Sequence, residues 1–193
     1  MLIGLTGKYC AGKNFIASLL EKRGLPVLDV DKLGYQALES EKETIFTQFG
    51  ADLKKTDGTL DRSLLGERVF GKPEKLAALE AIVHPAANLL TEKWIASQKG
   101  SCVINAALLH RSSVFRKLEK IIIVTAPYLI RFFRAKKRDK LPFKEIARRF
   151  KSQKDFTSQY LSSNAEIYRV GNSGFSGMRK LKRRIDMITE GIH

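Results

Sequence analysis

Cysteine is scarce in this chain, and so are the other residues that usually hold a structural metal. The 193 residues include two cysteines, Cys10 and Cys102, and three histidines. Two thiols are too few for a disulfide framework, and the sequence contains no CxxC pair or histidine cluster of the kind that binds zinc. The class of small disulfide-rich proteins is therefore excluded, and we expect both thiols to be reduced.

Long hydrophobic runs are also absent. No apolar stretch approaches the roughly 18 residues that are needed to span a membrane, and no charged leader precedes the apolar residues at the N-terminus. These absences predict a globular protein located in the cytoplasm, without a membrane partner. Because 44% of the residues are hydrophobic, a chain of this length can bury a substantial core, and we expect a single domain.

Acidic residues are few compared with basic residues. Asp and Glu number 20 against 35 Lys and Arg, which gives a formal net charge of +15. Such a surplus implies an anionic partner, and it leaves open nucleic acid, a phosphorylated small molecule or an acidic surface. The surplus is concentrated between residues 128 and 154, where eleven Lys or Arg stand against Asp139 and Glu145.

Short apolar runs alternate with longer amphipathic segments along the chain. Runs typical of buried strands lie at residues 2–6, 25–32, 101–106 and 120–125. A last strand with a turn is predicted at 164–174, and helical periodicity dominates 32–98. Within that region Pro73 is expected to begin a helix and Pro85 to end or kink it. The alternation predicts the α/β class, with a parallel sheet flanked by helices.

The segment between the first predicted strand and the following helix nearly matches a phosphate-binding loop. Its sequence GKYCAGKN, at 7–14, fits GxxxxGK. In such a loop the backbone amides and the helix N-terminus favour an anion, while the lysine meets the β and γ phosphates. Gly7 and Gly12 allow the tight backbone. The motif predicts an ATP site made of Gly7, Lys8, Tyr9, Cys10, Ala11, Gly12, Lys13, Asn14 and Phe15.

Asn14 stands where the motif normally has a Ser or Thr hydroxyl that ligates Mg²⁺. An amide oxygen can contact a hard cation, but on a longer and branched side chain. Three interpretations stay open: a working site that holds Mg²⁺ less well, a site in which another ligand compensates, or a nucleotide-binding relic. Tyr9 and Cys10 are either fillers of the loop or, for Cys10, a redox-active thiol whose pKa Lys8 and the helix N-terminus lower.

Two carboxylates follow the second predicted strand. Asp29 and Asp31 would share a face by strand alternation. A kinase needs a group that orients or deprotonates the acceptor hydroxyl, and one of the two is a candidate for this role, while the other helps to hold Mg²⁺ or the fold. Alternatively, Asp31 caps a helix that begins at Lys32.

These motifs together resemble the dephospho-coenzyme A kinase family. The segments that carry the resemblance are GLTG with GK at 4–13, PVLDVD at 26–31, GTLDRSLLGERVF at 58–70, VHP at 83–85, VTAPYLIRFFRAKKRD at 124–139 and RRFKSQ at 148–153. They follow the family's order over nearly the whole chain. The chain departs from the family pattern at Lys8, Cys10 and Asn14, and Arg111 stands where the family has an acid.

The resemblance implies a P-loop kinase fold that transfers the γ-phosphate of ATP to the ribose 3′-hydroxyl of dephospho-coenzyme A, with Mg²⁺. It implies a core of residues 1–31, 101–127 and 155–193, a helical substrate lobe of about 32–100 and a lid of about 128–154. Asp31 would be the base, Lys13 would neutralise charge and Arg138 would contact phosphate. His84 would bind substrate or serve the lobe's structure. Two alternatives stay open: another nucleotide or small-molecule kinase, and a degenerate nucleotide-sensing or nucleic-acid-binding protein on the same fold.

Overall fold

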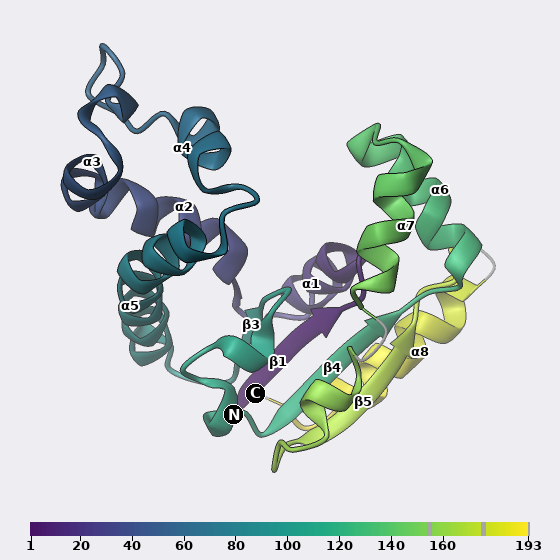
Figure 1. The fold of residues 1–193 in the computed structure, drawn as a ribbon. Helices are drawn as coiled ribbons and strands as arrows, with labels where there is room; N and C mark the ends of the chain where they lie inside the picture. Colours follow the sequence, from purple (N-terminus) through teal and green to yellow (C-terminus); the bar gives the residue numbers. More distant parts are fainter. Residues whose placement is uncertain (154–155, 175–176, 193) are drawn as a thin grey trace. The chain divides into compact units, whose positions relative to one another are not determined.

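The computed structural model describes residues 1–153, 156–174 and 177–192. The chain divides into two compact units, one of Met1–Asp29 with Gln98–His193 and the other of Val30–Ser97. The first unit contains the sheet and the second is mainly helical (Figure 1). None of the helices in the described ranges has the length and apolar character that crossing a membrane requires.

The first unit is built on a five-stranded parallel sheet with the order β2-β3-β1-β4-β5. The strands are β1 (Leu2–Gly7), β2 (Val27–Asp29), β3 (Cys102–Asn105), β4 (Lys120–Thr125) and β5 (Glu166–Gly171). A parallel sheet is covered on both faces, so its central strands are apolar at successive positions. In β4, Ile121, Ile122, Ile123 and Val124 are all fully buried. The predicted α/β class is confirmed.

Helices and short turns follow the strands of this sheet along the chain. The helices are α1 (Lys13–Glu21), α6 (Tyr128–Asp139), α7 (Phe143–Lys151) and α8 (Met178–Thr189), with 3₁₀ turns η2 (Leu109–Arg111), η3 (Phe115–Lys117) and η4 (Ser158–Tyr160). Ile3 and Leu5 of β1 share one core cluster with apolar residues of α1 and α8, such as Ile16 and Ile185. Alternate residues of a strand face opposite ways. Helices α1 and α8 therefore cover the face that Ile3 and Leu5 present.

The second unit contains α2 (Val30–Ser40), α3 (Lys42–Phe49), a 3₁₀ turn η1 (Ala51–Leu53), α4 (Arg62–Val69) and α5 (Pro73–Ser97). Asp61 caps α4, because its Oδ1 accepts hydrogen bonds from the amides of Ser63 at 3.0 Å and Leu64 at 3.1 Å. A separate core, which includes Ile45, Leu53 and Leu65, holds these helices together.

Helix α5 begins at Pro73, as predicted, but the expectation that it would end at Pro85 is wrong. The helix runs through Pro85 to Ser97. Proline has no N–H, so the carbonyl of Ala81 lacks its usual intrahelical donor. Ala81 and Pro85 are both exposed, and water can therefore replace the missing hydrogen bond.

Candidate functional site

The predicted phosphate-binding motif lies at a junction of strand, loop and helix. Strand β1 ends at Gly7 and α1 begins at Lys13. A Cβ atom at Gly7 would lie 2.9 Å from the carbonyl oxygen of Val124, so only glycine allows this approach of β1 to β4. Gly12 has a φ of 93° and precedes α1 without any side-chain cap. The N-terminus of α1 is therefore open to an anion.

Several backbone amides of the loop are available to a ligand. The amide of Ala11 donates to the carbonyl of Lys8 at 2.9 Å, which closes the turn. The amides of Cys10, Gly12 and Asn14, in contrast, have no acceptor within the described ranges. Amides of this kind, next to the positive end of a helix dipole, bind phosphate.

Cys10 takes a strained backbone conformation and has a thiol whose pKa is raised. Its φ is 59°, in the left-handed region that costs a non-glycine residue roughly 1–2 kcal/mol. Burial raises the pKa of the Cys10 thiol, and this outweighs the lowering by the Arg138 guanidinium. The expected lowering of the Cys10 pKa is therefore wrong, because desolvation of the thiolate exceeds the attraction of nearby positive charge. The redox role of Cys10 stays a prediction.

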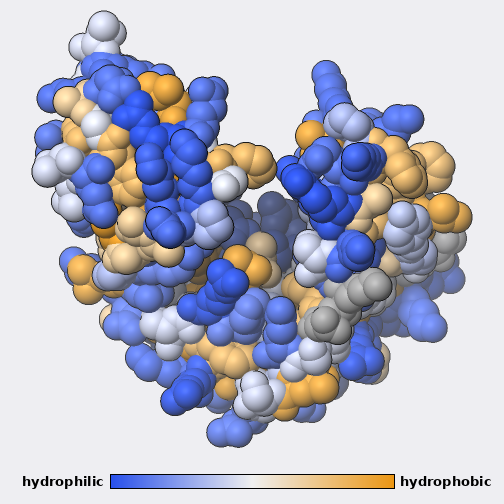
Figure 2. Space-filling model, viewed as in Figure 1, coloured by the Kyte–Doolittle hydropathy of each residue, from blue (hydrophilic) through white to orange (hydrophobic). Residues whose placement is uncertain are grey.

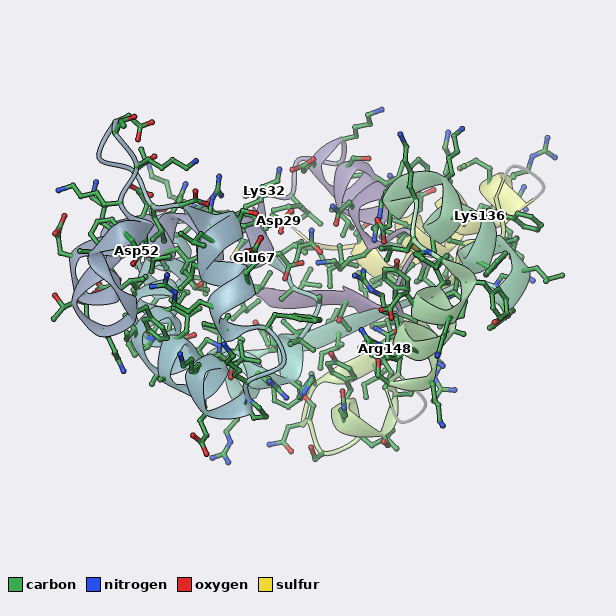
Figure 3. The ribbon with its side chains drawn as sticks, turned by 45° about the horizontal axis from the view of Figure 1, so that its top comes forward. Asp29, Lys32, Asp52, Glu67, Lys136 and Arg148 are labelled. Atoms are coloured by element: carbon green, nitrogen blue, oxygen red, sulfur yellow. The ribbon has the colours of Figure 1, made fainter. Side chains whose placement is uncertain are left out.

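Three polar side chains meet at the carboxyl ends of β2 and β3, close to the start of α1. Asn105 is the last residue of β3, is 2% exposed, and pairs in register with Asp29, the last residue of β2. Asp29 is labelled in Figure 3. Its Nδ2 donates to Oδ1 of Asn14 at 3.4 Å. Oδ1 of Asp29 and Oδ1 of Asn105 are buried without a hydrogen-bond partner among the described residues. Buried oxygens of this kind usually have a partner.

This group of oxygens fits a hard cation. The part of the chain that the structure describes has no group of three His, Cys, Asp or Glu side chains that could hold a metal. A cation at the ends of β2 and β3 would therefore depend on amide oxygens and the Asp29 carboxylate, which are acceptable Mg²⁺ ligands. Sequence reasoning missed Asn105, although a polar residue at the end of a buried apolar strand was a signal that could have identified it.

The segment predicted as a lid forms a helical hairpin of α6 and α7, joined at residues 140–142. Figure 2 shows hydrophilic side chains and several hydrophobic ones together on its surface. Arg148 of α7 and Lys136 of α6, labelled in Figure 3, are both exposed, and Arg148 pairs with Glu145 at 2.7 Å. One basic residue of this segment, Lys154, lies outside the described residues.

Two arginines of α6 attach this hairpin to the loop. Arg131 is buried, and its Nε donates to the carbonyl oxygen of Tyr9 at 2.8 Å. Arg134 Nη1 donates to the carbonyl oxygen of Ala11 at 3.1 Å, and its Nη2 donates to Oδ1 of Asn172 at 3.2 Å. These bonds use loop carbonyls, so they do not occupy the amides of Cys10, Gly12 and Asn14.

The predicted phosphate contact, Arg138, lies at the end of α6 next to the loop. Its Nε and Nη2 donate to the two oxygens of Asp139 at 2.6 and 3.0 Å, and its guanidinium lies 5.3 Å from the ring centroid of Tyr9. The hydrogen bonds from Arg138 lower the pKa of Asp139 to about 2. Asp139 is therefore a stable carboxylate at neutral pH.

A cavity of about 280 Å³ opens between the loop, α6 and the start of α8. Its lining includes Gly12, Phe15, Arg134, Asn172 and Met178. Apolar surface from the aromatic ring and the thioether combines there with an amide and a guanidinium. Such a lining suits a flat heterocycle that needs a few polar contacts.

A small polar network lies near the carboxyl end of β1, on the sheet face opposite to the one that Ile3 and Leu5 present. The hydroxyls of Thr6 and Tyr160 are 3.2 Å apart, and both residues are fully buried. Nδ1 of His110 lies 3.4 Å from the Tyr160 hydroxyl. Burial lowers the pKa of His110, so this network favours the neutral imidazole.

The remaining predicted residues belong to the second unit. Asp31 lies in the first turn of α2 and is exposed. Strand β2 ends at Asp29, so the expectation that Asp29 and Asp31 share a strand face is wrong, and so is a helix start at Lys32, because the chain turns helical at Val30. His84 is an exposed residue of α5. Their roles stay predictions.

Comparison with known sequences gives a consistent result. A family profile described as dephospho-CoA kinase matches residues 1–172. A dephospho-CoA kinase of Treponema pallidum is 32% identical over 198 residues, with 97% of this chain and 93% of the relative covered. A dephospho-CoA kinase of Shouchella clausii is 35% identical over 174 residues, with 86% and 88% covered.

Solved structures share the fold. The crystal structure of TT1252 from Thermus thermophilus has a TM-score of 0.83 and 29% identity, and covers 100% of this chain and 98% of its own. Dephospho-CoA kinase from Campylobacter jejuni has a TM-score of 0.71 at 22% identity, with 98% and 95% covered. Shikimate kinase from Bacteroides thetaiotaomicron reaches 0.56 at 13% identity, with 98% and 96% covered.

Proposed function

Since the chain belongs to the dephospho-coenzyme A kinase family and is an ATP-dependent phosphotransferase that forms coenzyme A, we propose that residues 7–15 bind the ATP phosphates in this reaction. The observation that carries the proposal is the set of amides at Cys10, Gly12 and Asn14 without an acceptor in the described ranges. They surround the uncapped N-terminus of α1. Lys13 would neutralise charge on the β and γ phosphates.

The adenine of ATP fits the cavity beside the loop. Its volume of about 280 Å³ and its lining of Phe15, Met178 and Asn172 suit a purine ring. Gly12 belongs to both the loop and the cavity wall. One nucleotide can therefore place its phosphates on the loop and its base in the cavity.

Asn14, Asn105 and Asp29 would hold the Mg²⁺ that accompanies ATP. The partnerless oxygens of Asp29 and Asn105 support this assignment, and it agrees with the interpretation in which other ligands compensate for Asn14. When bound, the ion neutralises charge on the phosphates and helps to orient them. The protein's own contribution is to keep acceptor oxygens in a dry site at the strand ends.

The α6–α7 hairpin would act as the lid over the triphosphate, with Arg138 as the phosphate contact. Arg131 and Arg134 attach α6 to the loop carbonyls, which keeps the basic hairpin at the site. A guanidinium held there can stabilise the negative charge of the transferring phosphoryl group.

Asp31 would orient the ribose 3′-hydroxyl of dephospho-coenzyme A and accept its proton during attack on the γ-phosphate. Its place two residues beyond β2 supports this role, because ligands of open parallel sheets bind beyond the carboxyl ends of the strands. His84 would contribute to binding of this acceptor.

The test is ADP formation by the purified protein with and without dephospho-coenzyme A, followed by the same assay on Asp31→Asn. We expect turnover that depends on the acceptor, and a loss of about 100-fold or more in kcat for the variant with ATP binding retained. Asp186→Asn, which changes a carboxylate of α8 paired with Arg23, is the matched control and should keep its activity. An unchanged kcat in Asp31→Asn removes the proposed base, and preference for another acceptor in a panel of nucleosides and small alcohols changes the substrate.

A further inference from the structure

Tyr9 is the loop residue whose backbone forms hydrogen bonds with both ends of the α6–α7 hairpin. Its amide donates to Oε1 of Gln153, just beyond α7, at 2.7 Å. Its carbonyl oxygen accepts from Nε of Arg131 in α6 at 2.8 Å. Arg131 Nη2 also donates to Oε1 of Gln153 at 3.4 Å. The backbone of Tyr9 is thereby fixed between the two helices.

The Tyr9 ring lies within a charged cluster of the hairpin. The guanidinium groups of Arg138 and Arg149 each lie 5.3 Å from its ring centroid. Its hydroxyl donates to Asp139, and the same carboxylate pairs with Arg138 at 2.6 Å and with Arg149 at 3.6 Å. We call Tyr9, Arg138, Asp139 and Arg149 the Tyr9 cluster.

The cluster holds more positive than negative charge. Asp139 stays ionised, because its pKa is about 2. Burial of Tyr9 and the hydrogen bond from Tyr9 to Asp139 raise the pKa of Tyr9, so the phenol is neutral. Two guanidinium groups and one carboxylate then leave one net positive charge beside the loop. Arg138 uses Nε and Nη2 on Asp139, and its Nη1 has no acceptor in the ranges that the structure describes.

We propose that Tyr9 is a positioning residue for the kinase reaction, which holds Arg138 and Arg149 at the phosphate loop before ATP binds. This proposal rests on the proposed function. The two arginine side chains are 62% and 49% exposed, and a long exposed side chain of this type loses considerable rotamer entropy when a ligand immobilises it. The Tyr9 ring and Asp139 restrict the two arginine side chains in advance, so ATP binds to arginines that already lie beside the loop.

The tyrosine supplies two separate contacts, which two substitutions can distinguish. Tyr9→Phe keeps the ring beneath both guanidinium groups and removes only the hydroxyl that bonds Asp139. Tyr9→Leu removes the ring as well. An isolated cation–π contact at an exposed site has a modest effect, so we expect Tyr9→Phe to raise the KM for ATP about 2- to 5-fold and Tyr9→Leu about 5- to 30-fold.

The experiment measures kcat, the KM for ATP and equilibrium binding of a fluorescent ATP analogue for the full-length protein and both variants. Phe133→Leu is the matched control, because Phe133 is an aromatic residue of α6 that is 66% exposed. We expect KM and ATP binding to weaken in the order wild type, Tyr9→Phe, Tyr9→Leu, with any fall in kcat following the same order, because Arg138 would also contact the transferring phosphoryl group. The control should be unchanged. In an Asp139→Ala background, which removes the acceptor of the Tyr9 hydroxyl, Tyr9→Phe should produce no further rise in KM.

Each contrary result is decisive. Equal ATP binding by wild type and Tyr9→Leu overturns the proposal, and so does full additivity of Tyr9→Phe with Asp139→Ala. Tyr9→Phe is nearly isosteric and answers the question if Tyr9→Leu does not fold. If the wild type binds ATP but does not turn over dephospho-coenzyme A, the proposed function fails, while the graded binding of the variants still tests the role of Tyr9.

Discussion

The side chain of Asn14 connects the phosphate loop to the end of β3, and its replacement tests the proposed cation site directly. Its Oδ1 accepts a hydrogen bond from Nδ2 of Asn105 at 3.4 Å. An oxygen that already accepts a hydrogen bond is less available to a cation than a free hydroxyl would be. Asn14→Thr removes this bond and restores the hydroxyl that the usual motif supplies.

The size of the effect follows from that one bond. A neutral hydrogen bond contributes about 0.5–1.5 kcal/mol net, which corresponds to a factor of about 2 to 13 in an equilibrium constant. At 3.4 Å the bond between Asn14 and Asn105 is longer than the usual N–H···O distance, so the lower part of this interval applies. We expect Asn14→Thr to lower the Mg²⁺ concentration for half-maximal activity about 2- to 5-fold.

The assay is a titration of Mg²⁺ at saturating ATP and dephospho-coenzyme A, with ADP formation as the signal. Direct binding of Mn²⁺ to the protein with ATP, followed by its electron spin resonance, gives a second measurement that does not depend on turnover. Asn14→Ala is the control without any ligating oxygen, and its half-saturating concentration should exceed that of the wild type. Coincident curves for wild type and Asn14→Thr would refute the reasoning, because Asn14 would then have no influence on the ion.

Three further predictions concern stability. Asn105→Val removes a buried oxygen without a partner in the described chain together with the long 3.4 Å bond from its Nδ2 to Asn14, so the free energy of unfolding in urea should rise by less than about 1 kcal/mol while Mg²⁺ binds less well. A fall of more than about 1 kcal/mol, beyond what the lost bond to Asn14 explains, would show that the oxygen is satisfied. Burial lowers the pKa of His110 below its ordinary value of 6.5, so the unfolded chain binds more protons and stability should decrease as the pH falls below about 6.5, less steeply in His110→Gln. Asp61→Ala removes the cap of α4 and should cost about 0.5–2 kcal/mol, measured by thermal unfolding with Asp57→Ala as the comparison.

The strands could be predicted because the buried strands of a parallel sheet appear in the sequence as continuous apolar runs. The run at 120–125 gives β4 with the same bounds, and the run at 2–6 gives all but the last residue of β1. Both strands are buried on two faces, so apolar residues are continuous and their ends are sharp. The motif at 7–14 adds the junction with α1, since its glycines are required by the backbone itself.

The boundary between β2 and α2 could not be read in the same way. Three residues of strand are too few for alternation to be distinguished from the first turn of a helix, and the chain becomes helical at Val30. The error matters because it placed Asp31 on a strand face, whereas Asp31 lies in the first turn of α2. At Pro85 the local rule that a proline ends a helix is wrong, because an exposed helix position tolerates the missing hydrogen bond.

The contacts that distinguish this site depend on residues far apart in the sequence. Asn14 meets Asn105 across 91 positions, and Tyr9 meets Asp139 across 130. No periodicity or motif encodes such distances, and Tyr9 therefore looked like a filler of the loop. Only the packing of the α6–α7 hairpin against the loop brings these side chains together.

The departures of the loop from the family pattern and the contacts of Tyr9 have a common physical basis. Cys10 occupies a left-handed conformation that a glycine would adopt without strain, so the loop of this chain is less stable by itself than a glycine-rich one. The bonds from Arg131, Arg134 and Gln153 to the loop backbone offset that strain. A loop that depends on the hairpin for its shape also couples the phosphate-binding amides to the arginines of that hairpin. Binding of ATP phosphates to one is therefore expected to stabilise the other.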